Sequence, residues 1–224
     1  MESPSRPFAR RSYEYRTPRL LIRTPTSVDE EAYYALSTDP GNYPYDEAET
    51  ELTREALTEF IKRIPDYSFD GEAAFFVIEL RETGEVIGLC GYNAFKFQKP
   101  AQYLKRPGAS SHPTWQTDIG LTIDYKHWRK GYGVEAFCGL VEYARRELDC
   151  NLIRVQTNLE NEPWIKLMDK VGLSEFKKPD KVIFENKNGE KGEKDVWNWR
   201  FDAEDWAKAR RVMVEAAKWP ISST

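Results

Sequence analysis

The stretch DIGLTIDYKHWRKGYGVEAFCGLVEYA, residues 118–144, places a strand pattern, a short glycine loop and a helix pattern directly one after another. The apolar residues of 115–124 indicate a strand. From Gly131 to Leu148 apolar residues recur every three or four positions, which predicts an amphipathic helix. These apolar positions are Val134, Phe137, Leu140, Val141, Ala144 and Leu148. The stretch therefore predicts a strand that turns sharply into a helix.

The loop between strand and helix has the composition of an anion site. The start of a helix exposes unpaired N–H groups and the positive end of the helix dipole. Gly131 and Gly133 allow a diphosphate to approach the backbone closely, and Arg129 and Lys130 add positive charge. The alternative is that the two glycines only form a tight turn. The loop lacks the Gly-Lys-Ser/Thr of a nucleotide-binding loop and the full G-x-G-x-x-G of a dinucleotide fingerprint.

Strand and helix patterns alternate along the rest of the chain, which predicts a mixed α/β domain. Strands are expected at 20–23, 74–80, 86–95, 152–157, 182–184 and 196–201, with polar turns at 82–85 and 186–189. Helices are expected from Ser27 or Asp29 to Leu36, at 50–64 with Pro65 as its end, at 162–171 with Gly172 as its end, and at 202–218 with Asp202 as its cap. Residues 96–113 show no clear period.

Four segments carry a family resemblance. The loop WRKGYGVEA resembles the Q/R-x-x-G-x-G/A acyl-CoA loop of the GNAT (GCN5-related) N-acetyltransferases, and most of all the branch that includes the ribosomal-protein N-terminal acetyltransferases. Residues 17–23 resemble the opening strand of that branch, and residues 118–123 its central strand. Asn161 followed by Lys170-Val171-Gly172-Leu173 resembles its "Asn…Glu-Lys-Leu-Gly-Phe" helix.

The resemblance implies a GNAT fold, a mixed α/β (α+β) arrangement whose central sheet is splayed open near its middle and flanked by helices. It covers residues 17–201, which we expect to form the acyltransferase domain. Residues 1–16 are rich in Pro and Arg and are expected to be a mobile tail or a segment laid across the surface. Residues 202–224 are expected to form a helix and tail packed on the domain.

The cofactor implied by the resemblance is acetyl-CoA. Its pantetheine arm is expected to pair with strand backbone at Leu121, Thr122 and Ile123, and a strand N–H at Leu121 or Thr122 is expected to bind the oxyanion. The pyrophosphate is expected on Arg129, Lys130, Gly131, Tyr132, Gly133 and Val134. Trp164 is expected to fill space beside the pantetheine and to favour acetyl over longer acyl groups.

Transfer to an amine needs a base that removes a proton from an ammonium group. Asp118 is the first candidate, because that branch often has an acidic residue at this place. His112, in the polar segment 96–116, is the second. Asp124 is a weaker candidate, and His127 is expected to pack or to cap. Asn161 could either hydrogen-bond the cofactor arm or cap its helix.

Two positions depart from the family pattern. Met168 stands where family members often have a Tyr that protonates the leaving thiolate, and Trp164 stands where the branch often has Ser. Neither side chain can donate that proton. The departures keep open a second interpretation, a catalytically weak or inactive GNAT-fold protein that binds CoA as a sensor or scaffold.

The acceptor implied is a primary amine, either a small molecule or a peptide N-terminus. The acidic run Asp46, Glu47, Glu49 and Glu51 could line such a site or be solvated. The net charge of −4 and pI of about 5.5 argue against nucleic-acid binding. The arginines between Arg6 and Arg23 are interpreted as a solvated tail or local ion pairs. The sequence leaves a homodimer open.

The remaining composition excludes other site types. The chain has 3 Cys without CxxC spacing and 2 His, so no metal site is expected. Cys138 and Tyr132 are expected to pack rather than react. No apolar run is long enough to cross a membrane, and the N-terminus has no signal-peptide pattern. A cytoplasmic or nuclear protein is expected.

Overall fold

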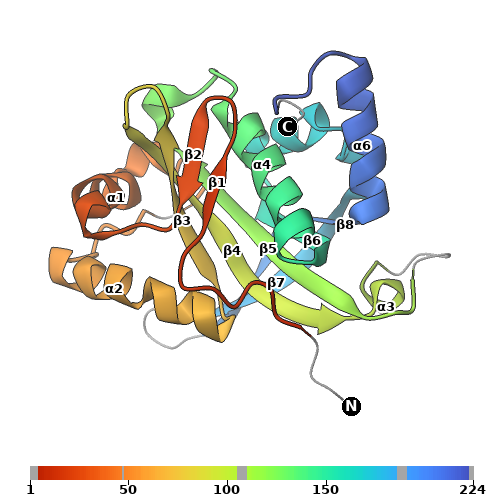
Figure 1. The fold of residues 1–224 in the computed structure, drawn as a ribbon, viewed down its shortest axis with the longest axis horizontal. Coiled ribbons are helices and arrows are strands. Elements are labelled where there is room, and N and C mark those ends of the chain that lie inside the picture. Colours follow the sequence, from red (N-terminus) through yellow and green to blue (C-terminus); the bar gives the residue numbers. More distant parts are fainter. Residues whose placement is uncertain (1–4, 47, 105–109, 186–190, 222–224) are drawn as a thin grey trace.

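A single mixed sheet organises the molecule. The computed structural model describes residues 5–46, 48–104, 110–185 and 191–221. The described strands form an eight-stranded sheet in the order β1-β2-β3-β4-β5-β6-β8-β7, and β5 and β6 are its parallel neighbours (Figure 1). The strands are β1 (Glu14–Arg16), β2 (Leu20–Arg23), β3 (Ala74–Leu80), β4 (Val86–Gln98), β5 (Thr114–Ile123), β6 (Cys150–Asn158), β7 (Lys177–Glu185) and β8 (Lys191–Asp202).

Helices cover both faces of this sheet. On one face, α1 (Glu30–Thr38) and α2 (Arg54–Asp70) contact β4 and β3. On the other, α4 (Tyr132–Glu147) lies across β5 and β6, with α5 (Glu162–Lys170) and α6 (Ala203–Glu215) beside it. The short α3 (Pro100–Leu104) contacts β8. The order of elements and the covered mixed sheet confirm the predicted mixed α/β class.

The alternation of side chains along β3 explains the two apolar layers. Phe75 packs with Leu57, Ile61 and Ile64 of α2, whereas Phe76 points into the main core under α4. Successive residues of a strand face opposite sides of the sheet, so a continuous apolar run is required where both faces are covered.

The predicted helix α4 is the centre of the main core. Its apolar face is buried, and Phe137 packs edge-on against Trp206 of α6 with ring centroids 6.2 Å apart. The buried Glu142 of α4 accepts a hydrogen bond from the Trp206 indole at 2.7 Å. The closing helix is thereby fixed to the body of the domain.

The described part of the N-terminal segment is laid across the domain. Phe8 is 1% exposed and stacks on Phe95 with ring centroids 4.2 Å apart. Tyr13 is also buried, and β1 pairs with β2 along the sheet edge. Of the two arrangements expected for the residues before position 17, the described ones adopt the packed one.

Pro65 does not end its helix, and that prediction was wrong. Helix α2 continues through Pro65 to Asp70 and ends at Gly71, whose φ of +74° is left-handed. A proline inside a helix costs about 3 kcal/mol. Packing beyond it compensates, because Tyr67 contacts the rings of Phe60 and Phe75 and Ser68 is 1% exposed.

The other differences concern lengths. Strand β4 runs to Gln98 and α3 follows within the region that shows no period. Strand β7 is longer than expected because it is an edge strand with polar, exposed residues, and edge strands also tolerate Pro179. The turn expected at 186–189 lies outside the described residues. No helix in the described part of the chain is long and apolar enough to cross a membrane.

Candidate active site

The sheet opens between its two parallel strands. Strand β5 pairs with β6 only at Trp115–Asp118, opposite 150–154. Beyond this point β5 continues on β4 to Ile123, and β6 continues on β8 to Asn158. The backbone of 119–123 therefore has no strand partner on its β6 side, and its N–H and C=O groups face the gap. This is the splay that the family resemblance implies.

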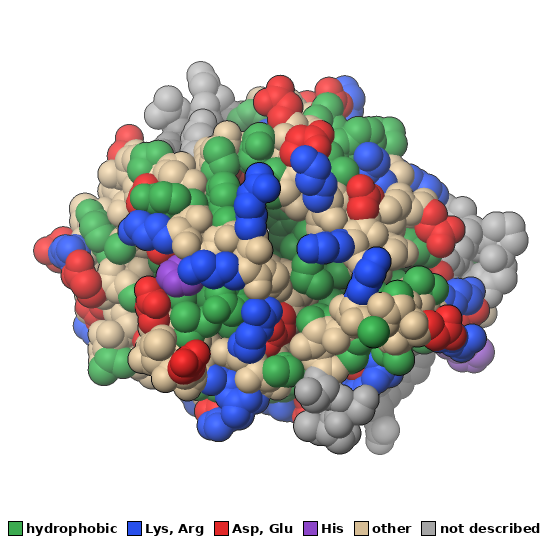
Figure 2. Space-filling view, turned by 90° about the horizontal axis from the view of Figure 1, so that it is seen from above, with side chains coloured by type: hydrophobic (Ala, Val, Ile, Leu, Met, Phe, Trp, Pro, Cys, Tyr) green, Lys and Arg blue, Asp and Glu red, His purple; other side chains and the backbone are tan. Residues whose placement is uncertain are grey.

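An open cleft of about 2480 Å³ occupies this gap. One side is built by β5 and the loop before α4, and the other by β6 and the start of α5; residues 40–51 contribute a further wall. Figure 2 shows Lys and Arg side chains gathered around a hollow on the face seen from above. Arg129, Lys166 and Lys170 are among the cations that line the cleft.

The loop before α4 presents an uncapped helix start to the cleft. Arg129 and Gly131 both have left-handed backbones, with φ of +62° and +85°. The first intrahelical bond runs from the Glu135 N–H to the Gly131 carbonyl at 3.1 Å, and Gly131 supplies no capping side chain. The N–H groups of Tyr132, Gly133 and Val134 thus precede the hydrogen-bonded ladder, as an anion site requires.

Most residues expected to form the site meet at the cleft. Those that line it are Asp118, Leu121, Thr122, Ile123, Arg129, Gly131, Tyr132, Gly133, Val134, Asn161 and Trp164. They come from β5, from the loop and first turn of α4, and from the start of α5. Residues that are 46 positions apart in the chain, such as Asp118 and Trp164, are brought together by the parallel pairing of β5 and β6.

Two expected residues lie elsewhere. His112 precedes Thr114, which is seven residues before Leu121 on an extended strand, about 23 Å away at ~3.3 Å per residue. Its side chain is exposed and does not line the cleft. Lys130 also does not line the cleft, and its carbonyl accepts a hydrogen bond from the Arg19 guanidinium at 3.0 Å.

Asp118 is 7% exposed and is paired with Arg154 of β6. The Arg154 Nε donates to Oδ1 at 2.8 Å, and Gln116 donates to the same oxygen. Arg154 was not identified from sequence. The sequence does contain a pattern that could have indicated it, because polar Arg154 and Gln156 alternate with apolar Ile153 and Val155. Alternate residues of a strand share one face, and the register of β5 with β6 places Arg154 opposite Asp118.

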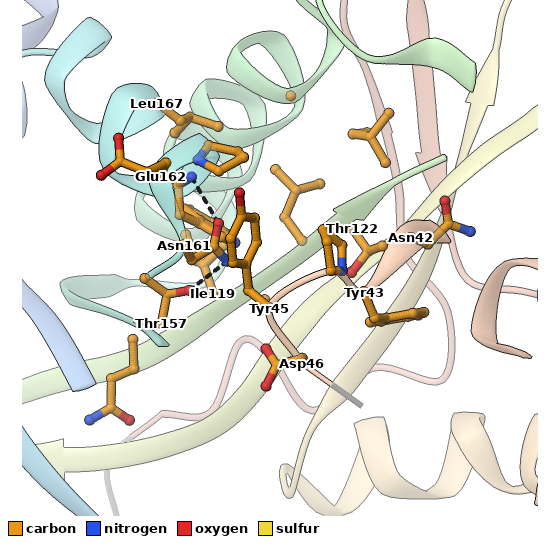
Figure 3. A pocket seen from close by; sticks show the side chains of 18 of the residues that line it. Asn42, Tyr43, Tyr45, Asp46, Ile119, Thr122, Thr157, Asn161, Glu162 and Leu167 are labelled. Carbon is orange, nitrogen blue, oxygen red and sulfur yellow. Dashed lines mark hydrogen bonds between the residues drawn. The ribbon is translucent and has the colours of Figure 1, made fainter. Parts of the chain in front are cut away.

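Asn161 caps α5. Its side-chain oxygen accepts from the Trp164 N–H at 3.2 Å, and its amide nitrogen donates to Thr157 Oγ1 at 2.8 Å (Figure 3). The oxygen and the nitrogen of the Asn161 side-chain amide therefore both form hydrogen bonds within the protein. Met168 is 0% exposed in the core, whereas Trp164 lines the cleft and packs edge-on against Phe137 at 6.0 Å.

The segment 42–46 crosses from one lip of the split to the other. The Tyr43 hydroxyl shares hydrogen bonds with Thr122 on β5 and with Ser37, and burial raises the pKa of Tyr43. On the other lip, Asn158 donates to the Tyr45 carbonyl and to Asp46 Oδ1, the latter at 2.9 Å.

In Figure 3 the Tyr45 ring projects into the cleft toward Asn161. Sequence reasoning identified only the acidic residues of this region; Asp46 and Glu51 line the cleft, and Glu47 lies outside the described residues.

The side chains after β5 stabilise the loop. Asp124 caps the short turn that follows by accepting from the Lys126 N–H at 3.1 Å. The Trp128 indole donates to the Ile123 carbonyl at 2.6 Å. His127 lies 3.5 Å from the Glu85 carboxylate, with its ring 6.3 Å from that of Tyr132. Within the described residues no group of three or more His, Cys, Asp or Glu is arranged to hold a metal ion.

A splayed mixed sheet with a glycine loop that opens into a helix at the split defines an acyltransferase fold. The family model for the acetyltransferase (GNAT) domain matches residues 19–174. The chain belongs to the GNAT acetyltransferases.

Three similar proteins illustrate this placement. The uncharacterized N-acetyltransferase p20 of Bacillus licheniformis is 28% identical over 157 residues, which is 70% of this chain and 80% of that protein. Mycobacterium smegmatis RimJ, solved with CoA-disulfide, has a TM-score of 0.64 at 14% identity, covering 92% of this chain and 94% of its own. The ribosomal alpha-N-protein acetyltransferase RimL, solved with coenzyme A, has a TM-score of 0.59 at 13% identity, covering 85% and 99%.

Proposed function

We propose that this chain is an acetyl-CoA-dependent N-acetyltransferase that moves an acetyl group directly to a primary amine in a ternary complex. One observation carries the proposal: the uncapped start of α4 opens onto a cleft whose floor is the unpaired edge of β5. A helix end that can bind phosphate and a free strand edge in the same cleft suit a ligand with a diphosphate at one end and an amide-containing arm at the other.

The chain's own groups fit acetyl-CoA. The N–H groups of residues 132–134, which precede the hydrogen-bonded ladder of α4, would bind the diphosphate, and Arg129, Lys166 and Lys170 of the cleft lining would supply positive charge. The backbone of Leu121–Ile123 can pair with the amides of the pantetheine arm as a strand partner would. Trp164 narrows the cleft from the α5 side, which favours a short acyl group.

Acetyl-CoA supplies the acetyl group as a thioester. The amine must reach it as a neutral nucleophile, and Asp118 is the acidic side chain of β5 that lines the cleft. We propose that Asp118 takes the ammonium proton through a water molecule, with Arg154 fixing the carboxylate. A backbone N–H at Leu121 or Thr122 stabilises the oxyanion.

The leaving thiolate receives no proton from the position of Met168, because that side chain is apolar and buried. A thiolate is a good leaving group, since the pKa of a thiol is about 8.5, so unassisted departure is chemically reasonable. The same observation favours the second candidate function, a GNAT-fold protein that binds CoA with weak or no transfer.

The proposed acceptor class is supported by the acidic side chains of the cleft and by the likeness to RimL, whose name assigns it a protein N-terminus. Asp46 and Glu51 line the cleft and would attract an ammonium group, although Lys194 lies 3.5 Å from Asp46. We propose a primary amine, on a peptide or a small molecule, as the acceptor.

The free, buried thiols of Cys90, Cys138 and Cys150 fit a reducing cytoplasmic environment.

The test is turnover. Purified protein is incubated with acetyl-CoA and a panel of peptides with free N-termini, polyamines and amino acids, and thiol release is followed together with the mass of the acceptor. Acceptor-dependent release with intersecting initial-rate lines supports direct transfer, whereas parallel lines would indicate a covalent enzyme intermediate. Tight CoA binding with no turnover of any acceptor would favour the sensor.

A further inference from the structure

Glu135 lies in the first turn of α4, one turn beyond the glycine loop, and its carboxylate is buried. The residue is 1% exposed. It accepts hydrogen bonds from Thr17 Oγ1 at 2.6 Å, from the Arg19 N–H at 2.8 Å and from Arg19 Nε at 2.6 Å. The carboxylate thus joins the start of α4 to the residues just before β2, which are more than 110 positions away in sequence.

Arg19 extends this connection to the glycine loop. Its Nη1 donates to the Lys130 carbonyl at 3.0 Å, and its guanidinium carbon lies 4.6 Å from the centroid of the Tyr132 ring. Its Nη2 lies 3.4 Å from the point where a Cβ on Gly131 would stand. Arg19 does not line the cleft, whereas Gly131 and Tyr132 do. The guanidinium therefore supports the loop from behind.

Two physical consequences follow. The left-handed backbone at Arg129 is a sparsely populated conformation for a residue other than glycine, and it persists only where surrounding contacts hold it. In addition, a carboxylate in the first turn of a helix opposes the binding of an anion at that helix end. The ion pair with Arg19 cancels the Glu135 charge at 2.6 Å, so the start of α4 keeps its attraction for a phosphate.

We propose that Arg19 and Glu135 form a positioning pair that holds the glycine loop in its ligand-binding conformation and neutralises the only acidic side chain of the first turn of α4. The inference rests on the proposed function, since it takes the loop to be the diphosphate site of acetyl-CoA. Arg19 acts through the loop and touches neither the acyl group nor the amine. Sequence separation hid the pair, although both residues lie in the segments that carry the family resemblance.

The chain supplies a matched control. Arg23 lies on β2 four residues after Arg19 and also pairs with a buried carboxylate, Asp29, at 2.7 Å, as well as with Glu79 at 2.8 Å. Arg23 does not line the cleft. Loss of Arg23 should destabilise the domain in a comparable way without disturbing the loop.

The experiment is calorimetric titration of CoA into the wild type, Arg19→Ala and Arg23→Ala. We expect Arg19→Ala to weaken CoA binding about tenfold or more, and Arg23→Ala to change it by less than about twofold while lowering the melting temperature. In turnover assays Arg19→Ala should raise KM for acetyl-CoA with little change in kcat. It should leave the use of S-acetylpantetheine, which lacks the diphosphate, unchanged.

If Arg19→Ala does not fold, Arg19→Lys provides the test, because it keeps the charge but loses the geometry of the guanidinium fork; it should also weaken CoA binding. Equal CoA affinity in the wild type and both Arg19 variants would overturn the inference and leave the proposed function standing. Equal losses in the Arg19 and Arg23 variants would assign the effect to general loosening and also overturn it. Absence of CoA binding in the wild type would instead contradict the proposed function.

Discussion

The Arg154 guanidinium donates Nε to Oδ1 of Asp118 at 2.8 Å and Nη2 to Oδ2, across the last paired residues before β5 and β6 diverge. Burial alone would lower the pKa of Arg154, but the hydrogen bond to Asp118 and the charge of that carboxylate, with smaller effects of Tyr103 and Asp180, together outweigh burial and raise it. The arginine therefore stays charged throughout the assay range. The ion pair fixes a carboxylate at the apex of the split, where the proposed mechanism places the general base.

Asp118→Asn should lower kcat by about 10²- to 10⁴-fold at saturating acetyl-CoA, the usual range for loss of a general base. The KM for acetyl-CoA should change little, because Asp118 lies away from the loop. Steady-state kinetics with a peptide acceptor measures both. Asp180→Asn is the matched control, since Asp180 accepts from Arg200 at 2.7 Å but does not line the cleft. An undiminished kcat in Asp118→Asn would place the base elsewhere.

Trp164 should limit the length of the acyl group. Its ring lines the cleft and is positioned by Phe137. Trp164→Ala is expected to raise kcat/KM for butyryl-CoA relative to acetyl-CoA by at least about tenfold, because a larger pocket accommodates two further methylenes. Trp219→Ala, which removes a ring packed on Trp206 outside the cleft lining, should leave the ratio unchanged. If the ratio of kcat/KM for butyryl-CoA to that for acetyl-CoA is the same in Trp164→Ala and Trp219→Ala, another residue limits the length of the acyl group.

No cysteine should carry the acyl group. Cys138 is 0% exposed, and burial raises the pKa of its thiol, so it stays protonated at neutral pH. A thiol reagent should label none of the 3 cysteines in the native protein and all of them in denaturant. Cys138→Ala should retain kcat. Stoichiometric acetylation of Cys138 by acetyl-CoA would contradict direct transfer.

The domain should lose stability in acid partly through Asp29. Burial would raise the pKa of Asp29, but hydrogen bonds from Arg23 and from the Thr26 N–H outweigh it and lower the pKa below 3.8. A carboxyl whose folded pKa is depressed stabilises the native state above its unfolded pKa, and the contribution is lost as pH falls through the folded pKa. The melting temperature is measured at about pH 5 and about pH 3, which lie on either side of the pKa of an unfolded aspartate, about 4. Between these two pH values the melting temperature of Asp29→Asn should fall less than that of the wild type.

The exposed pair Glu31–Arg54 is the control for this effect, because both side chains are more than half exposed. Glu31→Gln should have the same melting temperature as the wild type across the range. If the melting temperature of Asp29→Asn falls as much as that of the wild type in acid, other carboxylates account for the loss of stability.

The sequence predicted those parts of the site that depend on local chemistry. Gly131 and Gly133 between a strand and an amphipathic helix already indicated a helix start open to an anion, and the left-handed Gly131 agrees with that reading. The long-range contacts were not predictable. Arg19 and Glu135 meet only because β2 and α4 pack together, and no local pattern encodes that pairing.

The prediction at Pro65 failed for a related reason. A local rule ends the helix there, but the aromatic contacts of Tyr67 with Phe60 and Phe75, formed only in the folded domain, carry α2 onward. Tyr43 and Tyr45 were missed because their loop has no periodic signal, although it spans the two lips of the split.

The loop at 131–133 is proposed to hold acetyl-CoA, and the melting temperature with and without saturating acetyl-CoA tests this site. At about 100 times its dissociation constant a ligand stabilises the native state by ~2.7 kcal/mol, which for a domain of this size is a rise of ~5–10 °C. Gly133→Asp should abolish the rise, because it places a carboxylate at the phosphate position. Gly133→Ala should fold normally, since the added Cβ meets Leu167 at an ordinary 3.5 Å. A rise in the wild type that is lost in Gly133→Asp supports acetyl-CoA binding at the loop; no rise in the wild type at millimolar acetyl-CoA would contradict it.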